Sequence, residues 1–192
     1  MERQFTESAS VKTKMAEMLP AEIETVGDVL IRAIRQRKKI LWCGNGGSAA
    51  DAQHLSTELV SRLRFNRPAI ASIALTTDTS FLTAHANDFG FDDIFARQVE
   101  ALGNEGDVLI GISTSGNSEN IIRAMDRAKQ RKITMVVLSG KDGGKLKRIA
   151  DYNLSVPSRE TQRIQEGHIT IGHILCDLIE QELYAAEYDR NG

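Results

Sequence analysis

One stretch, Ile40-Leu41-Trp42-Cys43-Gly44-Asn45-Gly46-Gly47-Ser48, decides the fold of this chain. Its first four residues are apolar and predict a buried strand. The glycines that follow free the backbone for a tight turn, and Ser48 with Asp51 three residues later predicts the N-cap of a helix. A strand, a glycine turn and a helix N-terminus together form an anion site, because unpaired N–H groups and the helix dipole favour negative charge there.

The helix predicted after this turn carries two residues that are suited to acid–base chemistry. His54 and Glu58 are four residues apart and therefore lie on one face of a helix. Taken singly, His54 reads as a surface or core histidine and Glu58 as a solvated charge. Their position directly after the glycine turn favours a functional pair, because a ligand bound at the turn would lie beside them.

Strands and helices alternate along the rest of the chain. This alternation predicts an α/β fold, a doubly wound five-stranded parallel sheet with helices on both faces. No linker or repeat interrupts the pattern, so residues 1–192 are expected to form a single domain, with the N-terminal helices of 1–37 packing on it or on a neighbouring subunit. The predicted strands are 40–43, 70–75, 107–112, 133–138 and 152–156, and the predicted helices are 6–18, 21–37, 48–64, 78–86, 92–102, 119–129 and 160–187.

Composition excludes several classes of function. The chain has 192 residues, 41% of them hydrophobic and 26% charged, as in an ordinary globular protein. A net charge of −2 argues against a nucleic-acid or anionic-membrane surface, and no apolar run is long enough to span a bilayer. We expect Cys43 and Cys176 to be core thiols rather than a disulfide, which fits a reducing compartment, the cytoplasm.

A second polar loop, Ser113-Thr114-Ser115-Gly116-Asn117-Ser118, follows the third predicted strand. Its hydroxyls and backbone N–H groups can surround a phosphate, although the same residues could simply cap a helix. No Gly-Lys-Ser/Thr sequence follows, so a nucleotide triphosphate is not expected. Both polar loops follow strands and therefore lie at the carboxyl edge of the sheet, where ligands bind in such folds.

Further polar side chains lie elsewhere in the chain. Asn87 and Asp88 either end a helix or line the edge of a cleft. On the last helix, spacing places Glu166 and His173 on one stripe but does not decide whether Gln165 or Glu166 faces a site.

The motifs together resemble the phosphoheptose isomerases of the sugar isomerase (SIS) domain class. The motifs are Cys-Gly-Asn-Gly-Gly-Ser at 43–48, Asn-Asp-Phe-Gly at 87–90, Gly-Ile-Ser-Thr-Ser-Gly-Asn-Ser at 111–118, Gly-Lys-Asp-Gly-Gly at 140–144 and Arg-Ile-Gln-Glu at 163–166 with His173. The resemblance covers nearly the whole chain. It implies conversion of sedoheptulose 7-phosphate to D-glycero-D-manno-heptose 7-phosphate, the first step of bacterial ADP- and GDP-heptose precursor synthesis, by a homotetramer with active sites at subunit interfaces.

The resemblance also implies roles for individual residues. A zinc site of the family falls on His54, Glu58, Gln165 and His173, which are also described there as reacting groups. Gln162 is a departure, since family members often carry an acidic residue at this position. Sugar-phosphate contacts fall on His54, Glu58 and Gln165, and on Asn45, Gly46, Gly47, Ser48, Asn87, Asp88, Ser113, Thr114, Ser115 and Ser118.

Isomerisation through an enediol needs one proton moved between adjacent carbons and another between two oxygens. We assign the carbon proton to Glu58 and the oxygen side to His173, as for a carboxylate and an imidazole in triosephosphate isomerase. If zinc is bound, these groups are less free as bases and the metal could polarise the substrate oxygens.

Two alternatives share the same loops. Non-catalytic SIS-domain proteins that bind the replication initiator DnaA lack an acidic residue at the position of Glu58, which is present here. A sugar-phosphate-sensing regulator, or an isomerase of the same class, would prefer another sugar.

Overall fold

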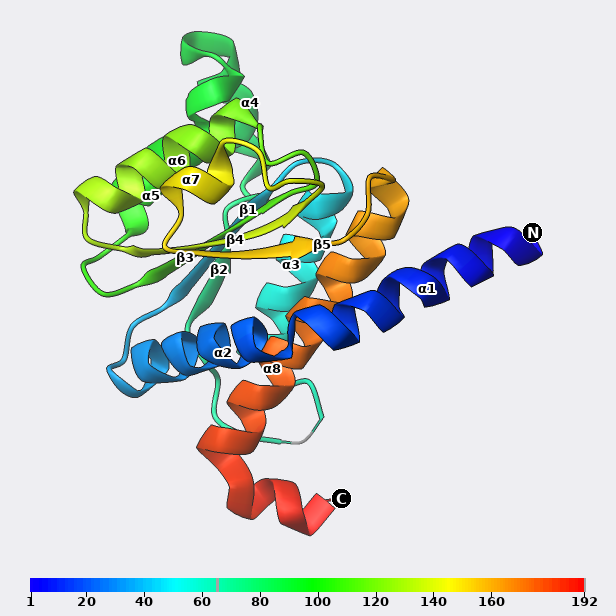
Figure 1. Ribbon diagram of the computed structural model, residues 1–192. Coiled ribbons are helices and arrows are strands. Elements are labelled where there is room, and N and C mark those ends of the chain that lie inside the picture. Colours follow the sequence, from blue (N-terminus) through cyan, green and yellow to red (C-terminus); the bar gives the residue numbers. More distant parts are fainter. Residues whose placement is uncertain (65, 192) are drawn as a thin grey trace.

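A five-stranded parallel sheet forms the centre of the computed structural model, which describes residues 1–64 and 66–191 (Figure 1). The strand order is β2-β1-β3-β4-β5, and every neighbouring pair is parallel. The chain therefore winds outward in both directions from β1 and β3 at the middle of the sheet. The strands are β1 (Ile40–Gly44), β2 (Ser72–Ala74), β3 (Val108–Ser113), β4 (Thr134–Gly140) and β5 (Tyr152–Val156).

Helices cover both faces of this sheet (Figure 1). One buried core joins the sheet to α2, α3 and α8, and a second joins its opposite face to α5, α6 and α7. The predicted doubly wound α/β fold is confirmed. The helices are α1 (Glu2–Met18), α2 (Pro20–Arg35), α3 (Gly47–Val60), α4 (Thr79–Phe89), α5 (Ile94–Leu102), α6 (Glu119–Gln130), α7 (Leu146–Ile149) and α8 (Thr161–Asn191), with a 3-10 turn at Phe91–Asp93.

Strand β1 shows why the apolar run becomes a central strand. Side chains alternate between the two faces of a sheet, so Ile40 and Trp42 enter one core while Leu41 and Cys43 enter the other. All four are fully buried. Cys43 and Cys176 are free thiols, as expected, and burial raises the pKa of each to about 12.

The start of α3 corrects one prediction. The N-cap is Gly46 and not Ser48, and no side chain caps the helix. Gly46 has φ 56° and ψ −121°, a backbone conformation that glycine adopts at little cost. Ser48 is the second residue of α3 and is buried, so the capping box expected with Asp51 is not formed.

The neighbouring boundaries also differ from the prediction. Helix α3 ends at Val60, four residues before the expected Arg64, and β2 covers only Ser72–Ala74. Helix α4 continues through Asn87 and Asp88 to Phe89, and its C-cap is Gly90, whose φ is 104°. Asn87 and Asp88 therefore belong to the last turn of α4 and do not break it.

The N-terminal helices pack against the last helix. Both α1 and α2 contact α8, and α1 extends beyond the body of the molecule (Figure 1). The Ser8 hydroxyl donates a 2.6 Å hydrogen bond to Glu166, and Arg35 pairs with Glu182 at 2.6 Å. In the described part of the chain, no helix is long and apolar enough to cross a membrane.

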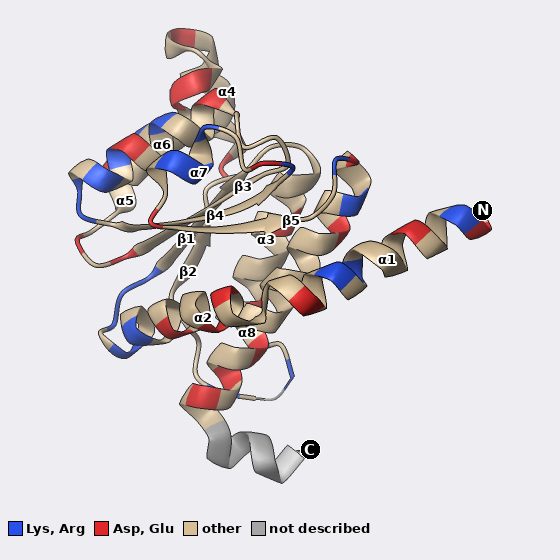
Figure 2. Cartoon of the chain, viewed as in Figure 1, with Lys and Arg blue, Asp and Glu red and all other residues tan. Residues whose placement is uncertain are grey.

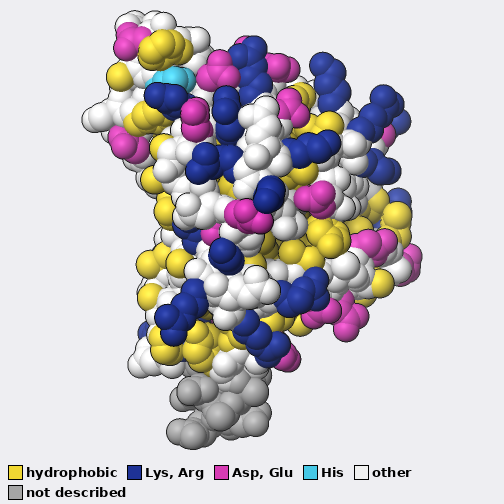
Figure 3. All heavy atoms as spheres, turned by 90° about the vertical axis from the view of Figure 1, so that its left-hand side faces the viewer, with side chains coloured by type: hydrophobic (Ala, Val, Ile, Leu, Met, Phe, Trp, Pro, Cys, Tyr) yellow, Lys and Arg dark blue, Asp and Glu magenta, His cyan; other side chains and the backbone are white. Residues whose placement is uncertain are grey.

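Charges of both signs are interspersed on the surface. Figure 2 shows basic and acidic residues alternating along α1 and α6. The face drawn in Figure 3 likewise mixes Lys and Arg with Asp and Glu. This distribution accompanies the small net charge of −2.

Candidate active site

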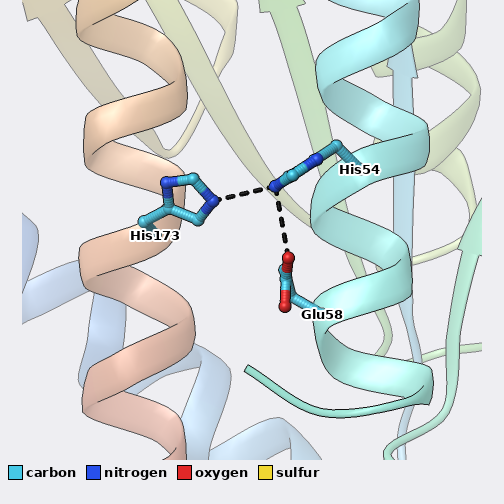
Figure 4. A group of neighbouring side chains, drawn as sticks. All are labelled: His54, Glu58 and His173. Atoms are coloured by element: carbon cyan, nitrogen blue, oxygen red, sulfur yellow. Dashed lines mark hydrogen bonds and ion pairs between the residues drawn. The ribbon is translucent and has the colours of Figure 1, made fainter. Parts of the chain in front are cut away.

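Two helices bring three chemically active side chains together. His54 and Glu58 project from α3 toward His173 on α8 (Figure 4). The Nε2 atom of His54 lies 2.9 Å from Nε2 of His173 and 3.2 Å from Oε1 of Glu58. The two imidazole rings meet edge to face, with centroids 5.0 Å apart. We call His54, Glu58 and His173 the three-residue cluster.

Small residues allow α3 and α8 to approach closely enough to form this cluster. A Cβ atom on Gly172 would lie 2.3 Å from Leu55 Cδ1, and one on Gly47 would lie 2.5 Å from Gln165 Nε2. The first contact lies at the level of His54 and His173. The second places Gln165 beside the glycine turn that precedes α3.

The cluster has the donor set of a metal site. Its ligand atoms all lie within 4.8 Å of one another. In a tetrahedral zinc site with Zn–N bonds of about 2.0 Å, ligand atoms are about 3.3 Å apart, close to the two separations at His54 Nε2. Two facing ring nitrogens also need a proton or a cation between them. The residues therefore fit a divalent cation with open coordination positions.

The two polar loops lie side by side at the carboxyl edge of the sheet. They follow β1 and β3, which are neighbours, and the chain leaves these strands toward opposite faces, as at the switch point where ligands bind. The side-chain amides of Asn45 and Asn120 exchange two hydrogen bonds of 2.9 Å and so join the loops. The hydroxyls of Ser113 and Ser118 lie 3.0 Å apart.

The motif at residues 140–144 packs against the polar loop at residues 113–118. Gly116, with φ 66°, packs so closely on Gly143 that a Cβ atom would lie 2.0 Å from its carbonyl oxygen. The Leu146 N–H donates to the Gly116 carbonyl at 2.9 Å, and the Lys145 N–H donates to Asn117 Oδ1 at 3.0 Å. The loop that carries Thr114 and Ser115 is therefore fixed by backbone contacts.

The structure distinguishes the surroundings of Gln165 from those of Glu166, a choice that helix geometry alone left open. Gln165 lies beside Gly47, whereas Glu166 accepts hydrogen bonds from Ser8 and Arg163. His168 is buried on the sheet side of α8, where its Nε2–H donates to the Ser139 carbonyl at 2.9 Å. Burial lowers the pKa of His168 to about 4, so it is neutral near pH 7.

Asn87 and Asp88 are not brought to the cluster within one chain. They lie at the end of α4, which packs mainly on α5 and the 3-10 turn and projects from the body of the molecule (Figure 1). The Asn87 amide donates a 2.9 Å hydrogen bond to Asp88.

Sequence reasoning gave no role in the site to two polar residues of this region. Asn120 is the partner of Asn45, and only its place in the first turn after Ser118 hints at that role. Asp51 lies three residues before His54 and seven before Glu58, on the same side of α3. Its Oδ2 is buried without a hydrogen-bond partner among the described residues, and burial raises the pKa of Asp51 to about 6.

Comparisons with known proteins identify the relatives of this chain. The SIS domain family profile matches residues 4–140. The phosphoheptose isomerase of Sulfurimonas denitrificans is 56% identical over 88% of this chain and 86% of its own length, and that of Clostridium acetobutylicum is 50% identical over 98% and 97%. The chain belongs to the phosphoheptose isomerase family.

Solved structures agree with this membership of the phosphoheptose isomerase family. The structure of phosphoheptose isomerase GmhA from Neisseria gonorrhoeae superimposes with a TM-score of 0.89 at 44% identity, covering 94% of this chain and 96% of that one. The phosphoheptose isomerase from Francisella tularensis gives a TM-score of 0.91 at 40% identity with the same coverage. These relatives give no support to the alternative of a DnaA-binding protein.

Proposed function

We propose that this protein is an aldose–ketose isomerase that converts sedoheptulose 7-phosphate to D-glycero-D-manno-heptose 7-phosphate through an enediol. This is the first step of bacterial ADP- and GDP-heptose precursor synthesis. The observation that carries the proposal is the three-residue cluster, a carboxylate and two imidazoles beside two phosphate-type loops. Relatives that are 50% and 56% identical to this chain are named phosphoheptose isomerase.

The proton transfers are assigned to two members of the cluster. Glu58 removes a proton from one carbon and, after exchange with solvent, delivers a proton to the neighbouring carbon, while His173 carries the proton between the two substrate oxygens. Transfers of this kind each contribute roughly 10²–10⁴-fold to a rate. The Glu58 side chain is only 17% exposed, which protects a carboxylate base from bulk water while leaving it reachable.

Zinc is the proposed metal of the site. His54, Glu58 and His173 would hold it, with Gln165 as the fourth ligand implied by the family pattern. A bound zinc ion polarises substrate oxygens and stabilises negative charge that develops on them. The 3.2 Å separation of His54 Nε2 from Glu58 Oε1 would suit two ligand atoms of the same ion.

The loops after β1 and β3 are proposed to hold the sugar phosphate. The backbone amides of Gly46 and Gly47 can bind the anion at the α3 N-terminus, and Ser48, whose own amide donates to the Asn45 carbonyl at 3.0 Å, can add its hydroxyl. The loop that follows β3 at the same edge of the sheet would add the hydroxyls of Ser113, Thr114, Ser115 and Ser118, and Asn45 joins the two loops through its hydrogen bonds with Asn120. Asn87 and Asp88 lie at the end of α4, which packs mainly on α5 and the 3-10 turn, and this position supports an active site completed at a subunit interface.

A homotetramer and a cytoplasmic location complete the proposal. The exposed apolar side chains of Phe5 and Met18 on α1, and of Ile174 on α8, support burial between subunits. Two free buried thiols support a reducing compartment.

The test is a panel of ketose phosphates of five to seven carbons, each converted in an assay that detects the aldose product. The proposal predicts the highest kcat/KM with sedoheptulose 7-phosphate. Equal or higher kcat/KM with a five- or six-carbon ketose phosphate would overturn the substrate assignment, and no turnover of any of them would overturn the isomerase function.

A further inference from the structure

A buried ion pair lies between α3 and α8 outside the three-residue cluster. Arg67 Nε donates to Glu180 Oε1 at 2.8 Å, and both side chains are fully buried. The backbone N–H groups of Leu63 and Arg64 donate to the two oxygens of Glu180 at 2.9 and 3.1 Å. Among the described residues the carboxylate accepts three hydrogen bonds, and the Arg67 guanidinium balances its charge.

The other donors of Arg67 bind the end of α3. Its Nη2 donates to the Glu58 carbonyl at 2.6 Å, and its Nη1 donates to the Leu59 and Pro68 carbonyls at 2.8 and 3.0 Å. The last carbonyls of a helix have no partner within the helix. Arg67 supplies a partner to two of these carbonyls and so caps α3, which ends at Val60 and not at the expected Arg64.

Each partner of this ion pair is tied to one of the two helices that carry the cluster. Arg67 binds the main chain of Glu58 itself. Glu180 lies seven residues after His173 on α8, two turns along the same stripe and about 10 Å away along the helix. The pair therefore fixes the separation of α3 and α8 about two helical turns from the point where His54, Glu58 and His173 meet.

We propose that Arg67 and Glu180 are positioning residues for the isomerase reaction. We call the Arg67–Glu180 ion pair the clamp. It holds the main chain of Glu58 against α8 and so keeps the Glu58 carboxylate and the His173 ring at the separation that the reaction needs. The clamp touches neither the substrate loops nor the cluster side chains, so its loss should lower kcat rather than raise KM. The expected change in kcat rests on the proposed function.

The experiment compares Glu180→Gln and Arg67→Lys with the matched control Glu182→Gln. Glu182 is two residues further along α8 and pairs with Arg35 on the surface, where its side chain is 54% exposed. Each variant is assayed well below its melting temperature. Removal of supporting partners around such sites typically costs 10–100-fold in activity, so we expect kcat to fall roughly 10–100-fold in the two clamp variants with KM little changed. The control should retain the kcat of the unaltered protein.

A second readout is independent of turnover. The ring ¹⁵N chemical shifts of His54 and His173 report the 2.9 Å contact between their Nε2 atoms and should change in both clamp variants but not in the control. If the unaltered protein isomerises no ketose phosphate, the proposed function fails while these shifts still test the clamp. Glu180→Gln or Arg67→Lys with unaltered kcat and unaltered shifts would overturn the inference. A loss of kcat that only matches the fraction unfolded, or failure of both variants to fold, would also overturn it, because the pair would then serve stability alone.

Discussion

At the scale of single residues, burial determines which histidine can take part in chemistry. His168 and His173 both lie on α8, but His168 faces the sheet and is fully buried, whereas His173 faces α3. The sequence does not distinguish them by residue type. Their different surroundings do: burial lowers the pKa of His168 by more than its hydrogen bond to the Ser139 carbonyl raises it, so this imidazole stays neutral.

His168 makes stability depend on pH in a defined direction. Its pKa is lowered from 6.5 to about 4, so between these values the unfolded chain binds a proton that the folded chain does not. The free energy of unfolding therefore falls as pH drops through this range, by roughly 1 kcal/mol per pH unit. His168→Gln should remove this share of the pH dependence. Urea unfolding of both proteins from pH 7 to 4.5 measures it, and parallel curves would contradict the assignment.

At the scale of elements, the contact between α3 and α8 depends on a glycine. A methyl group at position 172 would lie 2.3 Å from Leu55 Cδ1, so the helices must move apart or the side chain must leave its rotamer. The distance between His54 and His173 is set by the same contact.

Gly172→Ala should therefore lower both stability and activity. Overpacking of this kind costs about 1–3 kcal/mol, even though alanine favours a helix more than glycine does. The matched control is Gly27→Ala in α2, where the nearest atom, Leu178 Cδ1, is 3.2 Å away and can shift. Thermal unfolding and kcat measured together test this. Equal melting temperatures for the two variants would contradict the proposed role of the helix contact.

Much of the fold follows from the sequence because burial patterns are local. The central strands and the order of elements could be predicted, since apolar runs such as 107–112 and 133–138 are bounded by glycine or polar turns. The early end of α3 could not, because it depends on Arg67 and on Glu180, more than a hundred residues later. The N-cap at Gly46 in place of Ser48 could not be predicted either, because it depends on a positive φ, and the side-chain preferences for N-cap positions do not indicate backbone angles.

The candidate site could be predicted only where it depends on local sequence patterns. The pairing of His54 with Glu58 follows from helix spacing, and their meeting with His173 requires the packing of α3 on α8. The difference between Gln165 and Glu166 depends on α1, because Ser8 binds Glu166. The sequence predicts only a capping role for Asp51, and its burial beside the cluster is what distinguishes it.

At the scale of the whole molecule, apolar side chains of the described residues gather at a surface formed by three helices. A cavity of about 450 Å³ lies between α1, α2 and α8 and is lined by Met15, Ile23, Ile174 and Leu178, among others. Its neighbour Met18 is 57% exposed. Apolar surface of this kind is typical of an interface.

We expect light scattering to give four times the 21.2 kDa mass of the chain. Ile174→Glu should shift this mass toward that of one or two chains, because it places a charge in the apolar cavity, and turnover should fall with it. Leu102→Glu on α5 alters an equally exposed side chain on the other face and should leave the tetramer intact. A monomeric unaltered protein with full activity would contradict the tetramer.

The most direct test of the isomerase assignment follows sedoheptulose 7-phosphate by ¹H NMR in D₂O, with the unaltered protein and with Glu58→Gln. The proposal predicts the anomeric signal of an aldoheptose 7-phosphate, with solvent deuterium entering at carbon 2. It also predicts that Glu58→Gln slows this conversion by roughly 10²–10⁴-fold. Absence of the aldose signal with the unaltered protein, or an unchanged rate with Glu58→Gln, would contradict the account.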